Sequence, residues 1–115
     1  MSYVTGFLLA VPTANKDRYV KSAEAAWPLF KRYGALEQVE TWGERIEDGK
    51  TTDFKRAVKL EEGEQVVFSW ITWPDKATAD AAWEKMKQDP EMEKMDMPFD
   101  GKRMIWGGFE TVFQS

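Results

Sequence analysis

Residues 66–73 have the sequence VVFSWITW, which is the clearest secondary-structure signal in the chain. β-Branched and aromatic residues dominate it, which is typical of a β-strand. Pro74 ends the strand because proline cannot donate to the hydrogen-bond ladder.

Asp75 can then cap a helix over residues 76–88. The inward-facing residues of that helix are predicted to be Ala79, Ala82, Trp83 and Met86. A second cap at Asp89 predicts a short helix over residues 91–95.

A similar strand–helix–strand pattern precedes this stretch. Residues 3–11 are apolar on both faces in their second half, which favours a central strand. Asn15 is suited to cap a helix that runs to about Tyr33. The apolar stripe of this helix is Val20, Ala23, Trp27 and Phe30. Residues 35–44 form a second strand with mixed faces, so we expect it either near an edge of the sheet or beside a water-filled space.

The remaining segments are the middle and the end of the chain. Residues 45–65 are irregular, and residues 52–58 within them fit either a short helix or an extended arm. Residues 103–113 form the last strand. Within it, Gly107-Gly108 indicates a bulge or a close-contact point. The predicted order is therefore β-α-β, an irregular link, and β-α-β.

This order predicts an α+β fold, a ferredoxin-like β-α-β-β-α-β antiparallel sheet, as one domain over residues 1–115. Both helices of such a fold lie on one face of the sheet. The first, third and fourth strands carry apolar or aromatic residues on both faces, so the second face would be an exposed apolar patch. A second copy packed against that face solves the problem. Residues 45–65 are the alternative cover, and we favour the homodimer.

Composition excludes several classes of chemistry. The chain has no Cys and no His, which excludes disulfides, thiolate catalysis, Ser-His-Asp triads and His-based metal sites. We expect no metal and no cofactor. The net charge of −4 argues against a nucleic-acid partner. The longest apolar stretch, residues 7–11, is too short to span a membrane, and the first residues lack a basic signal-peptide region. These features favour a cytoplasmic location.

Several short motifs resemble those of the YbaA-like family of uncharacterised bacterial proteins, domain of unknown function 1428. They are Gly6-Phe7, Ala10-Val11-Pro12, Tyr33-Gly34-Ala35-Leu36, Trp42-Gly43, residues 52–58, Val67-Phe68-Ser69-Trp70, residues 97–105 and Gly107-Gly108-Phe109. The resemblance implies a dimeric α/β barrel, a relative of the ferredoxin-like fold. It implies no reaction, although the wider barrel superfamily includes cofactor-independent monooxygenases, haem-degrading enzymes, isomerases and stress proteins. That wider likeness is an analogy of fold.

Two carboxylates are the candidate catalytic groups. Asp53 lies three residues before Arg56, so the two side chains share a face if this segment is a helix. Either the Arg56 guanidinium orients the Asp53 carboxylate at the mouth of the barrel, or the pair is a surface ion pair that holds an irregular loop in place. Glu40 lies beside Trp42 on a strand and either projects into the barrel as a base or is an exposed edge residue.

Two further groups are candidates for ligand binding. Lys102 and Arg103, with Trp106, form either an anion-binding loop that leads into an apolar pocket or a turn followed by a core strand. Methionines are frequent near the C-terminal helix and form either a pliable ligand lid or ordinary packing. They are Met86, Met92, Met95, Met97 and Met104.

The leading functional hypothesis is a homodimer that binds a small organic molecule in or beside a cavity between the two sheets. If it is an enzyme, we expect cofactor-free chemistry of a monooxygenase-like or isomerase-like kind. Glu40 or Asp53 would be the base, and Arg56 or Arg103 would hold a substrate anion. The alternatives are a non-enzymatic interaction or stress-response module, and, as a third reading, RNA binding through sheet aromatics.

Overall fold

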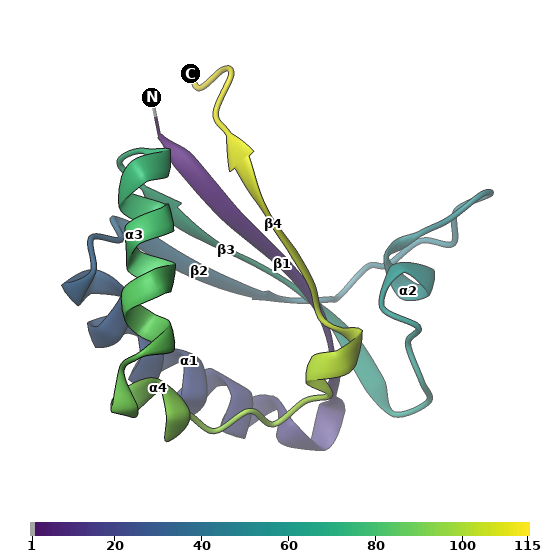
Figure 1. Cartoon of the computed structure of the whole chain (residues 1–115). Helices are drawn as coiled ribbons and strands as arrows, with labels where there is room; N and C mark the ends of the chain where they lie inside the picture. Colours follow the sequence, from purple (N-terminus) through teal and green to yellow (C-terminus); the bar gives the residue numbers. More distant parts are fainter. Residues whose placement is uncertain (1) are drawn as a thin grey trace.

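Four antiparallel strands form one sheet in the order β2-β3-β1-β4, and two long helices cover one of its faces (Figure 1). The computed structural model describes residues 2–115. The elements are β1 (Tyr3–Pro12), η1 (Thr13–Asn15), α1 (Lys16–Arg32), β2 (Glu37–Trp42), α2 (Phe54–Ala57), β3 (Glu64–Trp73), α3 (Lys76–Lys87), α4 (Pro90–Glu93), η2 (Gly101–Arg103) and β4 (Ile105–Glu110). This is the predicted α+β, ferredoxin-like arrangement, with β1 central and β2 at an edge.

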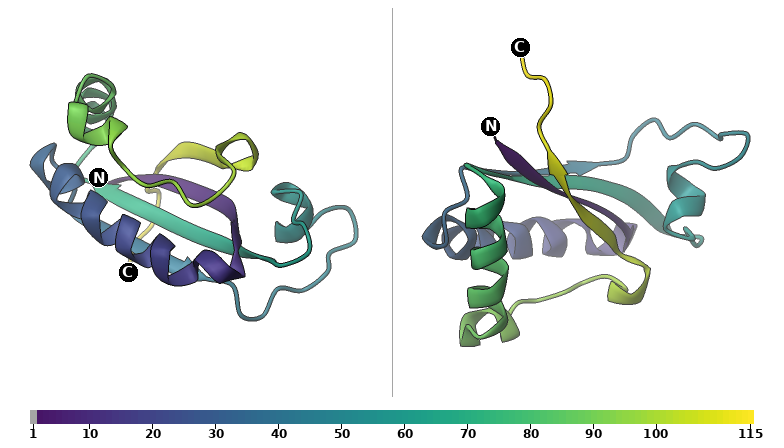
Figure 2. Two further views of the ribbon diagram at one scale, coloured as in Figure 1. Left: turned by 90° about the horizontal axis from the view of Figure 1, so that it is seen from below. Right: turned by 45° about the horizontal axis from the view of Figure 1, so that its top comes forward.

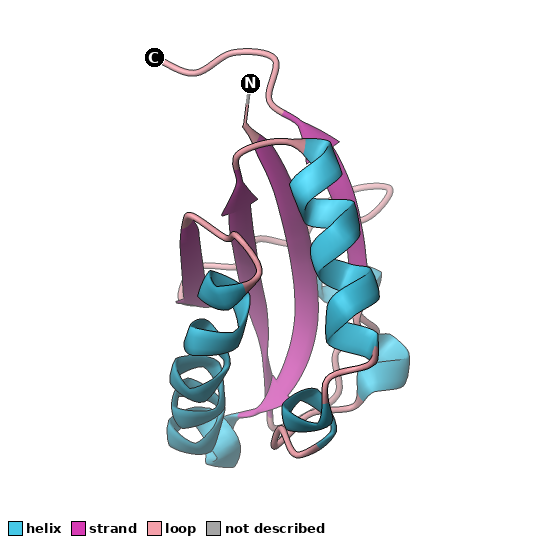
Figure 3. Cartoon of the chain, turned by 60° about the vertical axis from the view of Figure 1, so that its left-hand side comes forward, coloured by secondary structure: helices cyan, strands magenta, loops and turns pink. Residues whose placement is uncertain are grey.

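Both long helices lie on the same face of the sheet, as Figure 3 shows. Strand residues alternate between faces, so Phe7 and Leu9 of β1 face the helices, whereas Val4 and Leu8 face away. The core between sheet and helices includes Leu29, Phe30, Ala35, Ile71, Trp73, Ala79, Ala82 and Met86. The inward-facing residues predicted for α3 are therefore confirmed. Asp75 caps α3 by accepting a hydrogen bond from the backbone N–H of Thr78.

The inward stripe of α1 is turned by about one residue from the predicted one. Val20 is 43% exposed, whereas Tyr19 is buried. Tyr19 carries a polar hydroxyl on an apolar ring, and the ring can be buried because the hydroxyl finds a partner inside. Asn15 precedes α1, but its side chain makes no capping hydrogen bond. It donates instead to the carbonyl oxygen of Pro98, 3.1 Å away.

The opposite face of the sheet is covered at one end only. Residues 43–63 project beyond that end (Figure 2), and Val58 packs there against Ala10 and Val66. Residues 54–57 form the short helix α2, so the helical alternative for this segment is correct. The rest of the face leaves Phe68 46% exposed and Phe109 60% exposed. We call this surface the open face; its residues are Val4, Gly6, Leu8, Phe68, Trp70, Ile105, Gly107 and Phe109.

The last strand contains no bulge. Its register with β1 is unbroken from Tyr3↔Glu110 to Leu8↔Ile105, so the predicted bulge at Gly107-Gly108 is wrong. The alternative prediction, a close contact, is confirmed because a Cβ atom at Gly108 would collide with the Tyr3 side chain. Within residues 2–115, no helix has both the length and the apolar character needed to cross a membrane.

Candidate functional site

A cavity of about 330 Å³ lies between the helix-covered face of the sheet and the helices. The segment after α4, which runs along the lower edge of the molecule in Figure 1, contributes Met95, Met97 and Phe99 to its lining. We call it the central cavity. Its lining residues are Phe7, Leu9, Tyr19, Ser22, Ala23, Ala26, Phe30, Gln38, Glu40, Ser69, Ile71, Trp83, Met86, Lys87, Met92, Met95, Met97, Phe99, Met104 and Trp106. It lies on the other side of the sheet from the inter-sheet space in which the sequence analysis expected a site.

The floor of the central cavity is one row of residues across all four strands. Glu40 of β2 is opposite Ser69 of β3, Ser69 is opposite Phe7 of β1, and Phe7 is opposite Trp106 of β4. Residues paired in this way point to the same face. With strands about 4.8 Å apart, the backbones at the two ends of the row, at Glu40 and Trp106, are roughly 14 Å apart. We call it the floor row.

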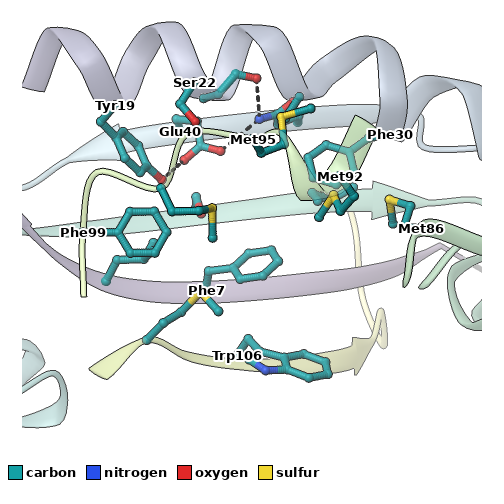
Figure 4. Close-up of a pocket in the computed structure, with 18 of the residues that line it drawn as sticks. Phe7, Tyr19, Ser22, Phe30, Glu40, Met86, Met92, Met95, Phe99 and Trp106 are labelled. Atoms are coloured by element: carbon teal, nitrogen blue, oxygen red, sulfur yellow. Dashed lines mark hydrogen bonds between the residues drawn. The ribbon is translucent and has the colours of Figure 1, made fainter. Parts of the chain in front are cut away.

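The polar end of the floor row is a small hydrogen-bonded cluster, shown in Figure 4. The Tyr19 hydroxyl donates to Glu40 Oε1 at 2.5 Å, and Gln38 Nε2 donates to Glu40 Oε2 at 3.1 Å. Gln38 Nε2 also donates to the carbonyl oxygen of Ala23 on α1. Burial, and then the charge of Glu40, raise the pKa of Tyr19 far above its ordinary value. Tyr19 therefore keeps its proton and is a donor. We call Tyr19, Gln38 and Glu40 the polar corner.

The roof of the central cavity is made by α1 and α3. Ala23 and Ala26 of α1 face the cavity, and their short side chains leave space that a larger residue would fill. Phe30 and Trp83 form the far wall, with ring centroids 6.1 Å apart and the rings edge to face. Aromatic rings in this arrangement pack rigidly, so this wall has a defined shape.

The third side of the central cavity is a methionine-rich segment. All five methionines singled out in the sequence line it: Met86, Met92, Met95, Met97 and Met104. The segment is tied to α1, because Arg18 makes two 2.6 Å hydrogen bonds to Asp96 and Ser22 donates to the carbonyl oxygen of Asp96. Met side chains adapt their shape easily, so this side can accommodate ligands of different outline.

Two of the predicted site residues, Glu40 and Trp106, lie in the central cavity at opposite ends of the floor row. Trp42 lies next to the cavity rather than in it. It packs against the buried cluster that includes Leu9 and Tyr19, and Lys16 Nζ lies 5.4 Å from the centre of its ring.

Asp53 and Arg56 are not brought to the central cavity. Asp53 caps α2 and accepts hydrogen bonds from the backbone N–H groups of Arg56 and Gly49, at 2.8 and 3.0 Å. The backbone N–H of Arg56, then that of Gly49, lower the pKa of Asp53 to about 2. The Arg56 guanidinium also donates to the carbonyl oxygens of Lys50 and Thr51. The pair therefore shapes the turn before α2, and a carboxylate so well solvated by donors is a weak base.

Lys102 and Arg103 lie on η2, just before β4. Lys102 is exposed. The Arg103 guanidinium is 15% exposed and makes a bidentate ion pair with Glu64, at 2.7 and 2.6 Å. It also bonds Asp100 at 3.0 Å. Its donors are thus already engaged, and the residue fixes the start of β4 beside Met104.

The central cavity offers no cluster of metal ligands. Glu40 is the one carboxylate among its lining residues. Across residues 2–115 there is no group of three or more Asp or Glu side chains that could hold an ion. What the arrangement can do is bind an apolar body and present one carboxylate and one tyrosine hydroxyl to a polar substituent.

Phe7, Tyr19, Gln38 and Ser69 line the central cavity but were not among the residues predicted from the sequence. Phe7, Gln38 and Ser69 were recoverable once strand register was assumed, because alternation places all three on the face of the sheet that carries Glu40. Tyr19 gave a weaker signal, since it lies one residue before an apolar stripe that also accounts for Ala23 and Phe30.

Comparison with known proteins places the chain in a family. The model of the family described as "Protein of unknown function (DUF1428)" matches residues 2–101. The YbaA protein of Escherichia coli K12, described as an uncharacterized protein, is 56% identical over 114 residues, which cover 97% of each chain. Among solved structures, a dimeric ferredoxin-like protein from an uncultured marine organism is similar with a TM-score of 0.62, at 11% identity over 100% of both chains. A dimeric ferredoxin-like protein of unknown function from Jannaschia sp. CCS1 has a TM-score of 0.52 at 15% identity, over 95% of this chain and 99% of that chain. The two structures share the fold, and the family match with the YbaA relative shows that this chain belongs to the DUF1428 family.

Proposed function

We propose that the protein is a homodimer that binds a small apolar organic molecule in the central cavity. The observation that carries this proposal is the cavity itself. Its volume of about 330 Å³ lies within the range of small-molecule sites, roughly 300–1,000 Å³. Its wall is aromatic and methionine-rich, and its polar groups gather at one corner. This is the composition of a ligand pocket and supports binding over a packed interaction module.

The open face supports the homodimer. Phe68, Trp70 and Phe109 lie on it, with Phe109 60% exposed. An apolar surface of this kind on a small protein is a typical partner-binding site, and two-fold pairing of like surfaces is the commonest solution. The two similar solved structures are described as dimeric. A cytoplasmic location is part of the same proposal.

Ligand binding is tested with 2-methoxynaphthalene, an apolar fluorescent probe that has no acidic proton. We expect it to bind the wild-type protein and to bind Ala26→Leu at least about tenfold more weakly, because the leucine fills the cavity. Ala25→Leu is the matched control, since Ala25 is exposed on the same helix. Equal binding by both variants, or no binding to the wild type, would refute the proposal.

The dimer is tested by light scattering during size exclusion. The wild type should have twice the chain mass of 13.3 kDa. Phe109→Lys places a charge on the open face and should yield monomers. Leu36→Lys, which changes an exposed apolar residue away from that face, should stay dimeric. A wild-type monomer at micromolar concentration would contradict the proposed assembly.

A further inference from the structure

The polar corner holds more hydrogen-bond acceptors than donors. The Tyr19 hydroxyl and the Gln38 amide each give Glu40 one hydrogen bond. Each carboxylate oxygen can accept a further bond. The carbonyl oxygen of Gln38 is buried and has no partner among residues 2–115. Buried acceptors are normally satisfied, so a ligand whose polar group enters this corner is expected to bring a donor.

Glu40 borders two spaces. It lines the central cavity, and it also lines an open groove on the outer side of β2 and α1, with Val20, Trp27 and Glu37. No Lys or Arg side chain in the described part of the chain forms an ion pair with it. A carboxylate in this position can meet a ligand on one side and exchange protons with water on the other.

Tyr19 is placed to assist such an exchange. Its hydroxyl is 2.5 Å from Glu40 Oε1, and its raised pKa keeps the proton on the phenol oxygen. When Glu40 gains a proton it becomes a poorer acceptor, and the Tyr19 hydroxyl is free to donate to an oxyanion beside it. A donor aimed at developing charge in a largely apolar cavity is a strong stabilising element. An ammonium ligand would have no use for this donor, which favours a weakly acidic hydroxyl.

The floor row defines the body of the ligand. Phe7 and Trp106 continue the row from the polar corner across β1 and β4, and Phe30 and Trp83 form the wall. Planar aromatic molecules stack on such surfaces. A fused or extended aromatic skeleton with a hydroxyl at one end matches both the shape and the chemistry of the cavity.

We propose that Glu40 accepts the proton of a phenolic or enolic hydroxyl on an aromatic ligand bound in the central cavity, while Tyr19 donates a hydrogen bond to the resulting oxyanion. The ligand O–H bond breaks, its electron pair stays on the oxygen, and the proton forms a bond to a Glu40 oxygen. Charge is conserved, because one anion replaces another, and no oxidant takes part. This inference rests on the proposed ligand binding and adds the ligand class and the roles of two residues.

The test uses 2-naphthol, whose hydroxyl becomes a strong acid in its excited state. Bound next to a proton acceptor it emits as naphtholate, and in an apolar site without an acceptor it emits as neutral naphthol. Excitation beyond the absorption of tryptophan isolates the probe. We expect naphtholate emission from the wild-type complex and its loss, with neutral emission, in Glu40→Gln. Tyr19→Phe should bind the probe and show a reduced naphtholate band.

2-Methoxynaphthalene separates the two proposals. It has no acidic proton and should bind the wild type. Measurable binding of this probe to Glu40→Gln, at whatever affinity, shows that the variant is folded and keeps the cavity. If both probes bind but the emission of 2-naphthol is the same in the wild type and Glu40→Gln, the proton-acceptor role is refuted and the binding function stands. If neither probe binds the wild type, the binding function itself is refuted, and the role of Glu40 is refuted with it.

Discussion

Replacing Thr5 by valine should destabilise the protein by about 1–3 kcal/mol. The indole N–H of Trp73 donates to Thr5 Oγ1 at 3.0 Å, and the two residues are 1% and 0% exposed. Valine has nearly the same shape as threonine, so the change leaves no large cavity. It removes the acceptor and leaves the buried indole N–H of Trp73 without a hydrogen-bond partner. The expected loss of stability is the desolvation free energy of that donor.

The same change can be expressed as a melting temperature. An unfolding entropy of about 2.1 cal/mol/K per residue over 115 residues makes 1 kcal/mol worth about 4 °C, so the midpoint should fall by about 4–12 °C. The bond also bears on the site. Trp73 packs edge to face against Trp83, with ring centroids 5.9 Å apart, and Trp83 forms part of the cavity wall.

Urea unfolding followed by tryptophan fluorescence provides the measurement, at one protein concentration because a dimer gains stability with concentration. A double-mutant cycle with Trp73→Phe isolates the bond from the packing changes. In the Trp73→Phe background, Thr5→Val should cost much less than in the wild type. A cost below about 0.5 kcal/mol in the wild-type background would show that the indole finds another partner, and the reasoning would fail.

Two further predictions concern the stability of the fold. Gly34 and Gly63 both have positive φ, at 108° and 82°. A Cβ atom at Gly34 would also lie 2.6 Å from Thr78 Cγ2, whereas the space around Gly63 is open. Gly34→Ala should therefore lower the free energy of unfolding in urea more than Gly63→Ala, for which the loss should be about 1 kcal/mol. Equal losses would show that the predicted clash with Thr78 does not matter. The pKa of Asp53 is about 2 in the folded protein and near 4 in the unfolded chain. The carboxylate therefore stabilises the fold above about pH 4, and this stabilisation is lost as the pH falls through about 2. The difference in melting temperature between the wild type and Asp53→Asn should be largest above pH 5 and disappear near pH 2. A difference that grows in acid would show that the pKa of Asp53 is not lowered by folding.

Much of the fold could be predicted because its signals are local. Residues 66–73 carry the side chains of a strand and end at a proline, and Asp75 caps the next helix as expected. The inward stripe of α1 was misplaced because Tyr19 counts as polar in a simple pattern. Its burial depends on Glu40, 21 residues away, which accepts its hydroxyl hydrogen bond. The spacing of apolar residues within one helix gives no information about a hydrogen-bond partner on a distant strand.

In the candidate site, too, the local relationships could be predicted from the sequence and the contacts between distant segments could not. Asp53 and Arg56 were paired correctly by their helical spacing, yet spacing does not show that their hydrogen bonds all stay within one turn. Glu40 and Trp106 were singled out separately, as a carboxylate and an aromatic residue on strands. Only the register of four strands makes them the two ends of one floor row.

The β-α-β-β-α-β order, the absence of His and Cys side chains, and the apolar residues on both sheet faces could all be read from the amino-acid sequence. These depend on residue type and on periods of two and 3.6, which are properties of short segments. The side of the sheet on which the cavity lies, and the carboxylate that reaches it, became clear only from the folded chain. Those outcomes depend on contacts between segments distant in the chain: alanines on α1 that hold space open, methionines that close it, and a tyrosine that turns inward to meet Glu40.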